Sequence, residues 1–143
     1  MPNEVSAEVR AFFDRFERAS DSLDVETIAT LFAEVFMSAD PNGVRAVPRD
    51  AFVAALPQRQ KLFDLMGATA IRPTALSETQ LDDNYVLVHT RWAADFRDPS
   101  QAPLTLSSSF ILRRGGESLA VVFYLNHQDI VALAQSRATG LPK

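Results

Sequence analysis

The chain has no cysteine among its 143 residues, which excludes disulfides, thiolate nucleophiles and cysteine-based metal sites. Its two histidines, His89 and His127, are too few and too far apart in sequence to suggest a dedicated metal site, so we predict none. Positive charge is scarce too. The net charge of -4 argues against a nucleic-acid partner, which needs a basic face. No apolar run approaches the roughly 18 residues of a membrane helix, so we expect no membrane partner.

The composition that remains is that of an ordinary globular protein, 47% hydrophobic and 22% charged. This length predicts a single domain over residues 1–143. The first residues lack the basic-then-apolar order of a signal peptide, and we therefore expect a cytoplasmic location. Ten phenylalanines stand against two tyrosines and one tryptophan. Phenylalanine fills cores, but it also lines pockets for apolar ligands.

The first half of the chain has a helical pattern. Apolar residues recur at three- and four-residue steps from Val5 to Leu23, and Asp24 suits the N-cap of a second helix that buries Ile28, Leu31 and Phe32. A short strand over 36–40, a turn at Asn42-Gly43 and a return strand over 44–47 follow. Pro48 opens the next helix, which we expect Pro57 to interrupt before it stops at Gly67.

The second half has the pattern of a sheet. Strands are predicted over 68–77, 85–96, 104–112 and 119–125, with Pro73 marking a bulge or an edge in the first of them. Alternation places Trp92 on one face of the second strand, and His89 and Arg91 on the other. A short helix over 130–134 closes the chain. Helices followed by a long antiparallel meander predict an α+β domain, and a strongly bent sheet can wrap around the helices so that both layers enclose one cavity.

The stretch "LFAEVFMSADPNG", from Leu31 to Gly43, is the most specific local motif. Together with the order of elements over about Glu4 to Arg137, it resembles the nuclear-transport-factor-2-like superfamily, in its SnoaL-like polyketide cyclase and ketosteroid isomerase branch. The resemblance implies a cone of N-terminal helices on a mixed, mostly antiparallel sheet. In the isomerases a helix runs into a strand that ends in Asp-Pro-x-Gly, and the aspartate is the proton-shuttling base. On this chain that residue is Asp40.

Other isomerase positions do not carry over. The isomerases stabilise an oxyanion with a tyrosine and a protonated aspartate, and the matching residues here are Phe16 and Ser108. Phe16 cannot donate a hydrogen bond, and a neutral serine hydroxyl is a weaker electrostatic stabiliser. The departure argues against steroid isomerisation, but it leaves the base and the pocket in place.

Two interpretations of Asp40 stay open. An aspartate before proline bonds its own backbone in a turn. An aspartate beside phenylalanines would be desolvated and could act as a general base. Trp92 is either core or ligand platform, and Ser108 either bonds a backbone carbonyl or points into a cavity.

Residues of the outer sheet face are expected to serve other roles. We assign His89, Arg91, Tyr124 and Asn126 to it, and His127 and Asp129 to the start of the last helix. Its apolar members predict a homodimer through this face; they are Tyr85, Leu87, Ile111, Val122 and Tyr124.

The sequence therefore predicts a pocket for an apolar small molecule. With Asp40 as proton shuttle, it would be a cofactor-free isomerase, cyclase or dehydratase. The alternatives are a non-catalytic ligand-binding or dimerisation module, and an interior filled by Phe and Met side chains. Residues from both layers are predicted to contact the ligand: Phe12, Phe16, Phe36, Ser38, Thr90, Trp92, Ser108, Phe110, Phe123 and Leu125.

Overall fold

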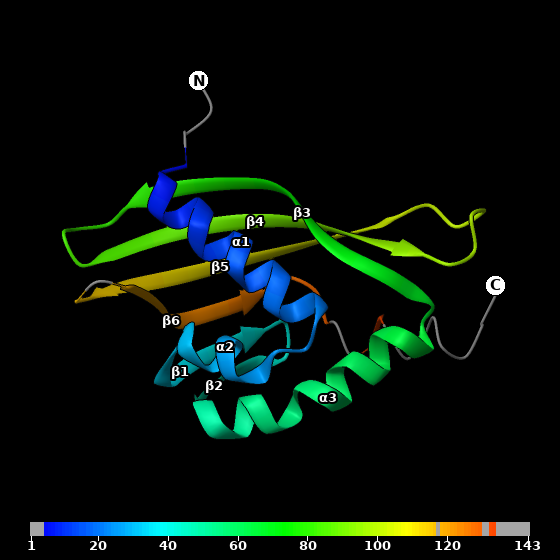
Figure 1. The fold of residues 1–143 in the computed structure, drawn as a ribbon, viewed down its shortest axis with the longest axis horizontal. Coiled ribbons are helices and arrows are strands. Elements are labelled where there is room, and N and C mark those ends of the chain that lie inside the picture. Colours follow the sequence, from blue (N-terminus) through cyan, green and yellow to red (C-terminus); the bar gives the residue numbers. More distant parts are fainter. Residues whose placement is uncertain (1–4, 117, 130–131, 134–143) are drawn as a thin grey trace.

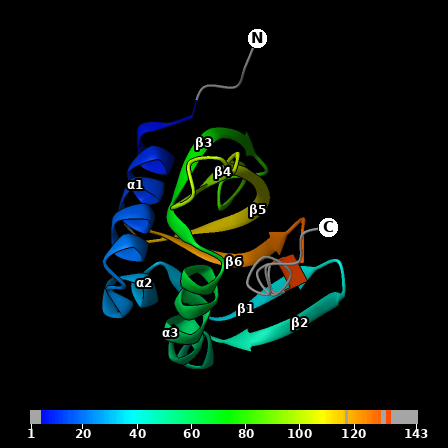
Figure 2. The ribbon, with the colours of Figure 1, turned by 90° about the vertical axis from the view of Figure 1, so that its right-hand side faces the viewer.

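In a computed structural model, described for residues 5–116, 118–129 and 132–133, three helices lie on one face of a six-stranded sheet (Figure 1, Figure 2). The helices are α1 (Ala7–Asp21), α2 (Val25–Thr30) and α3 (Arg49–Leu65), and the strands are β1 (Phe32–Asp40), β2 (Gly43–Pro48), β3 (Ala68–Gln80), β4 (Tyr85–Phe96), β5 (Leu104–Gly115) and β6 (Ser118–Asn126). The strand order is β2-β1-β6-β5-β4-β3. Among the strands of the described residues, the β1–β6 pairing alone is parallel, which confirms an α+β fold with a mixed, mostly antiparallel sheet.

Side-chain caps fix where the first two helices begin. The Ser6 hydroxyl accepts the Val9 N–H at 3.2 Å, and Asp24 caps α2 as predicted, accepting the Thr27 N–H at 3.2 Å and the Thr27 hydroxyl at 2.7 Å. The bond from the Thr27 hydroxyl, followed by that from the Thr27 amide, holds the pKa of Asp24 below its ordinary value. The second helix is shorter than its apolar stripe suggests, because Phe32 already opens β1.

Pro57 does not interrupt the third helix, contrary to the prediction. α3 runs unbroken over 17 residues with Pro57 inside it. Proline removes one backbone hydrogen bond from a helix interior. Leu56 and Phe63 are buried on either side of it, and this burial holds both halves of the helix against the sheet.

The strands β4 and β5 pair without any register shift from Tyr85↔Arg113 to Ala94↔Leu104. Alternation therefore holds along both: Val88, Thr90 and Phe110 are buried, whereas His89 and Arg91 are exposed. The edge strand β3 is bulged between Pro73 and Ala75, as the proline predicted.

A bulge in β6 changes which residues of that strand face the helices. Leu112 pairs with Val121, but the preceding Ile111 pairs with Phe123, so that Val122 is an extra residue. Beyond it the alternation is shifted by one. Tyr124 points inward and is 7% exposed. The prediction that Tyr124 faces outward was wrong for this reason, and so was the inward assignment of Phe123.

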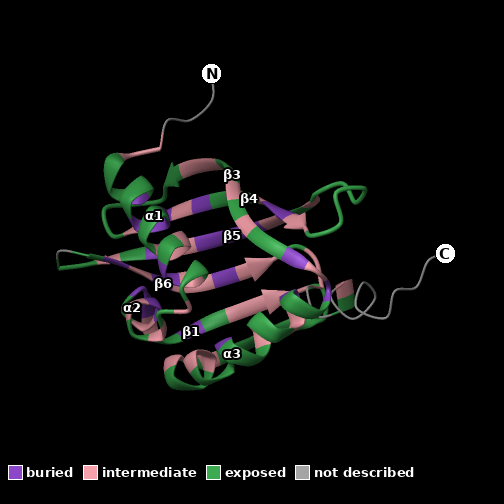
Figure 3. Ribbon diagram, turned by 45° about the vertical axis from the view of Figure 1, so that its right-hand side comes forward, coloured by how far each residue is buried: buried purple, intermediate pink, exposed green. Residues whose placement is uncertain are grey.

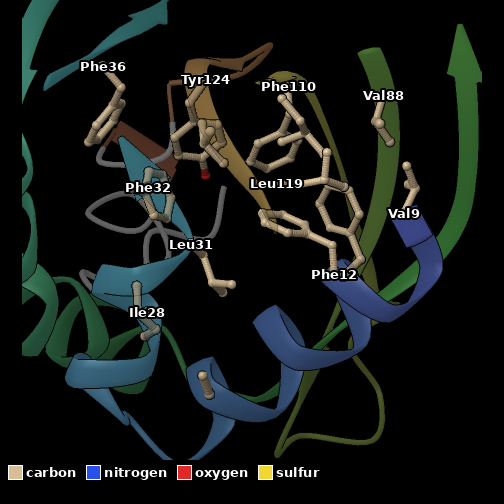
Figure 4. Close-up of a cluster of buried hydrophobic side chains, with 14 of the residues drawn as sticks. Val9, Phe12, Ile28, Leu31, Phe32, Phe36, Val88, Phe110, Leu119 and Tyr124 are labelled. Atoms are coloured by element: carbon tan, nitrogen blue, oxygen red, sulfur yellow. The ribbon is translucent and has the colours of Figure 1, made fainter. Parts of the chain in front are cut away.

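The core lies between α1, the start of β1 and the inner face of the sheet, where buried positions alternate along the strands (Figure 3). Aromatic rings dominate it. Phe32 packs against Phe36 with ring centroids 4.8 Å apart, and Tyr124 lies parallel to Phe110 at 4.7 Å (Figure 4). Around Phe32 and Phe36 the interior is filled by side chains, in line with the heavy use of phenylalanine.

Some predictions fall partly outside the described residues. Of the closing helix over 130–134, only residues 132–133 are described, and both are helical. The described helices include none that is long and apolar enough to cross a bilayer. The described part of the chain also holds no group of three or more side chains suited to binding a metal ion.

Candidate ligand-binding cavity

A cavity of about 220 Å³ lies between α1, α3 and the inner face of the sheet. Among the residues around it, aromatic and aliphatic side chains supply most of the wall, and polar side chains come from α1, α3, β3, β5 and the last inward residues of β6. The principal ones are Phe16, Glu17, Phe52, Leu56, Arg59, Phe63, Ile71, Trp92, Leu106, Ser108, Phe110, Tyr124 and Asn126.

Its apolar wall is built from rings that hold one another in place. Phe16 on α1 lies 6.4 Å from Trp92 and 5.9 Å from Phe110, measured between ring centroids. These contacts join the helix layer to β4 and β5. Packed edge-to-face and tilted rings give a rigid surface that suits a flat, apolar ligand.

Arg59 and Tyr124 form the polar end of the cavity. The Arg59 guanidinium donates a hydrogen bond to the Tyr124 hydroxyl oxygen at 3.1 Å. Its charge also lies 5.8 Å from the ring centroid of Phe63 and 5.9 Å from that of Tyr124, within cation–π range. Because the tyrosine oxygen accepts from Arg59, its own O–H proton is available to a further acceptor.

Ser108 and Asn126 form a second polar pair beside the first. They face each other across β5 and β6, and the Ser108 hydroxyl donates to the Asn126 side-chain oxygen at 3.0 Å. The Asn126 amide group keeps two N–H donors. Since Asn126 follows Tyr124 by two residues on one face, the two side chains lie about 7 Å apart along the strand.

Glu17 brings a carboxyl group to the α1 wall. Partial burial, followed by repulsion from Asp21 and Asp14, raises the pKa of Glu17 above its ordinary value, and Arg18 opposes the effect. Asp21, one helical turn further on, also lines the cavity. A carboxyl with a raised pKa inside a pocket is suited to exchanging a proton with a ligand.

Four predicted ligand contacts line this cavity: Phe16, Trp92, Ser108 and Phe110. Strand alternation placed Trp92, Ser108 and Phe110 on the face that the structure turns toward the helices. The Ser108 hydroxyl bonds a side chain, Asn126, which differs from both of the roles that the sequence left open for it.

Asp40 lies away from the cavity, at the far end of β1, where it pairs with Gly43. Its Oδ1 accepts the Asn42 N–H at 2.8 Å, two residues along. This is the turn geometry of an aspartate before proline. Of the two interpretations that the sequence left open, the structure therefore shows the turn. Asp40 directly follows Ala39, the last residue of β1 that pairs with β6, and it is not among the residues that line the cavity.

The other predicted contacts also lie outside the lining. Phe12 and Phe36 belong to the filled part of the core. Thr90 is 3% exposed, and its hydroxyl is bonded to the Ser108 carbonyl at 3.2 Å. Ser38 pairs with Tyr124 across β1 and β6 but is not among the lining residues, and the β6 bulge turns Phe123 and Leu125 to the outer face.

Sequence reasoning identified Ser108 but missed the other polar residues of the cavity, among them Glu17, Arg59, Tyr124 and Asn126. Arg59 had a usable signal, since it falls three residues after Leu56 and four before Phe63, within the buried stripe of its helix. Glu17 and Asp21 lie beside the buried apolar face of α1. Tyr124 and Asn126 had none, because nothing in the residue pattern marks Val122 as a bulge.

Solved structures share this architecture across most of the chain. An NTF-2 like protein of unknown function from Shewanella oneidensis MR-1 matches with a TM-score of 0.69 at 13% identity, covering 85% of this chain and 97% of that one. An NTF2-like protein with a cystatin-like fold from Novosphingobium aromaticivorans matches with a TM-score of 0.69 at 18% identity, covering 91% and 86%. The chain has the nuclear-transport-factor-2-like fold.

Within that fold, Aln2 from a Streptomyces species matches with a TM-score of 0.69 at 20% identity, covering 90% of this chain and 93% of Aln2. No protein-family model and no curated protein matches the sequence. Likeness at this level of identity establishes the nuclear-transport-factor-2-like architecture, and function has to be argued from the cavity itself.

Proposed function

We propose that the cavity binds a small, flat, apolar molecule that carries a carbonyl or carboxylate oxygen. The observation that supports this most strongly is the Arg59–Tyr124 hydrogen bond at the end of an aromatic pocket. The ligand's rings would lie against Phe16 and Trp92, and its oxygen would accept from Arg59, the Tyr124 hydroxyl or the Asn126 amide.

Donors dominate the polar end of the cavity. Arg59 has no acceptor atom, and the Tyr124 and Asn126 oxygens already accept hydrogen bonds from Arg59 and Ser108. An oxygen acceptor on the ligand would therefore pair with the donors that remain at this end. Unpaired buried polar groups are costly, so this arrangement favours oxygen-bearing ligands over plain hydrocarbons.

Calorimetric titration of 2-naphthoate, 2-acetylnaphthalene and naphthalene would test the proposal. Arg59→Gln should weaken 2-naphthoate binding by about tenfold to a hundredfold, the worth of one hydrogen bond to a charged group, and leave naphthalene unaffected. Tyr124→Phe should weaken the ketone. Arg45→Gln removes the same charge from the exposed surface of β2 and serves as the matched control. Equal affinities across the variants would refute the proposal.

A second candidate function is cofactor-free proton transfer, with Glu17 in the role that the resemblance gave to Asp40. The observation that favours it is the position of Glu17 in the cavity lining, together with its raised pKa. Glu17 would take a proton from the carbon next to the ligand's carbonyl, and the donors at Arg59 and Tyr124 would stabilise the enolate oxygen.

Proton exchange of 2-tetralone in deuterated buffer separates an enzyme from a binding module. Loss of the α-proton signal in the NMR spectrum should be faster with the wild-type protein than in buffer, and Glu17→Gln should abolish the difference while keeping binding. Exchange at the buffer rate, with binding intact, would leave a non-catalytic ligand-binding protein.

A further inference from the structure

The two histidines, 38 positions apart in the sequence, meet on the outer face of the sheet. The His89 Nδ1 atom lies 2.7 Å from the Ser109 hydroxyl, and the His127 Nε2 atom lies 2.9 Å from the same oxygen. Ser109 is 4% exposed, so the two rings cover it. One buried hydroxyl therefore fixes the orientation of both imidazoles and leaves the second nitrogen of each ring for another partner.

These rings border a surface depression of about 300 Å³, whose lining also includes Thr90 and Ser108, the second of which it shares with the aromatic cavity. Ser77, Arg91 and Ser107 also line it, and its lining includes no aspartate or glutamate. In a chain with a net charge of -4, a depression lined by a guanidinium, two imidazoles and hydroxyls stands out as a place for negative charge.

Arg91 is placed at this depression by the β ladder. It pairs directly with Ser107, and the His127 N–H bonds the Ser107 carbonyl at 3.0 Å, so the three residues follow one another across the sheet. His89 precedes Arg91 by two residues on the same face, about 7 Å along the strand. Within the described part of the chain, the ion pairs join Arg72 to Asp95 and Arg114 to Glu8, and Arg91 has no carboxylate partner.

The single proton of Ser109 decides what the histidines offer to a ligand. The hydroxyl can donate to only one of the two rings, so the other ring must donate its N–H to the serine oxygen. When both imidazoles are neutral, the first ring presents an N–H outward and the second presents a lone pair. One added proton on the second ring turns that lone pair into a donor without breaking either bond to Ser109, and it adds a positive charge.

We propose that this depression is a binding site for a small phosphate monoester. Two outward imidazole N–H groups, the Arg91 guanidinium and the hydroxyls of Ser77 and Ser107 outnumber the two oxygens of a carboxylate and suit the three terminal oxygens of a phosphate. The volume leaves room for an organic group beyond the phosphate. Binding is coupled to the uptake of up to one proton, taken by the histidine whose outer nitrogen was an acceptor.

The charged groups near the histidines bear on the uptake of this proton. Arg91 is the ionised group that β4 contributes, whereas β3 lines the depression with Ala75, Leu76 and Ser77. A carboxylate, that of Asp129, follows His127 by two residues. It accepts hydrogen bonds from the Asn42 side chain at 2.7 Å and from the Ala132 N–H at 2.9 Å.

Titration calorimetry with phenyl phosphate tests the site. The wild-type protein should bind it, and Arg91→Gln and His89→Gln should each weaken binding by about tenfold or more. Arg113→Gln is the matched control, because it removes an equal charge from an exposed position further along β5. Repeating the titration in buffers of different ionisation enthalpy should show proton uptake with the wild-type protein and a smaller uptake with His127→Gln.

Several outcomes would overturn the proposal: no binding at millimolar phenyl phosphate, equal affinity in Arg91→Gln and Arg113→Gln, or binding with no proton exchange. A loss caused by Arg59→Gln alone would assign the ligand to the aromatic cavity. Binding of Zn²⁺ that needs both histidines, without binding of phenyl phosphate, would make the pair a metal site instead.

Discussion

At the scale of single residues, two carboxyl groups lie where their surroundings in the sequence do not predict them. Asp40 follows an apolar run, yet its side chain bonds the backbone of its own turn. Glu17 lies among charged residues on α1, yet it lines the aromatic cavity. The difference comes from position in the fold. Residues of α1 and α3 line the cavity together, whereas no residue of β1 lines it.

Asp40→Asn should be nearly silent. Asparagine forms the same turn, so the free energy of unfolding should change by less than about 0.5 kcal/mol, and 2-naphthoate affinity should stay the same. Asp40→Ala loses the bond to the Asn42 N–H and should cost about 1 kcal/mol. Urea unfolding of the three proteins checks this. A large loss of ligand binding in Asp40→Asn would restore Asp40 as a functional base.

Glu17→Gln should stabilise the protein at neutral pH. Because the folded-state pKa of Glu17 is raised, the folded protein binds this proton more tightly than the unfolded chain. The ionised group therefore costs stability above the folded-state pKa, and the cost disappears as the pH falls below the unfolded-state value. The gain should stay below about 1 kcal/mol, because the side chain is partly hydrated.

Thermal unfolding from pH 4 to pH 8 measures this effect. The melting temperature of Glu17→Gln should exceed that of the wild type at pH 8 and converge with it at low pH. Glu34→Gln, at an exposed position of β1, should show no such trend. A melting-temperature difference that grows toward low pH would contradict the raised pKa.

At the scale of elements, Pro57 lowers the stability of α3. The proline leaves the Val53 carbonyl without its helical donor. Pro57 is exposed, so Pro57→Ala restores that bond without disturbing the core. Part of the gain is offset, because alanine loosens the unfolded chain. We expect a net stabilisation of about 1–2 kcal/mol, measured by urea unfolding, with Ala54→Gly as a destabilising reference. A destabilised Pro57→Ala would show that the packing of α3 depends on the proline.

Strand patterns predicted the inner face of β4 and β5 correctly and failed on β6, and the reason is physical. Alternation carries information only while the ladder is regular, and β4 and β5 pair without a shift. In β6 the extra residue Val122 reverses the sense of every later side chain. Val, Phe, Tyr and Leu around it are all good strand formers, so local propensity gives no sign of a bulge.

Helix boundaries show the same limit. Asp24 was correctly predicted as a cap, because a cap depends on the few residues next to it. The continuation of α3 through Pro57 depends on Leu56 and Phe63 packing against distant strands. Tertiary burial of this type overrides local propensity, and a single sequence does not display it.

At the scale of the whole molecule, the order of elements and the cone were predictable, because short connections and amphipathic faces leave few ways to stack these helices on this sheet. The contents of the cavity were not. They depend on how α3 lies across the open end of the cone, which brings Arg59 to Tyr124 over a separation of 65 residues. No local rule relates residues so far apart.

The outer face of the sheet predicts a homodimer. Leu87, Ile111 and Phe123 lie in one row across β4, β5 and β6, on the outer face of the sheet. Leu125 lies in the next row, paired with Ser109, and takes the outward place that we had assigned to Tyr124. Half-buried apolar side chains on an open sheet face are typical of an interface between subunits.

Light scattering at micromolar concentration should therefore give twice the chain mass of 15.8 kDa. Ile111→Asp places a charge in the centre of the row and should give monomers that stay folded, because the residue faces away from the core. Val44→Asp changes an equally apolar residue, 61% exposed on β2, and should leave the dimer intact. A wild-type monomer would exclude this interface. A dimer that survives Ile111→Asp but not Val44→Asp would show that the interface lies at the β1–β2 hairpin instead.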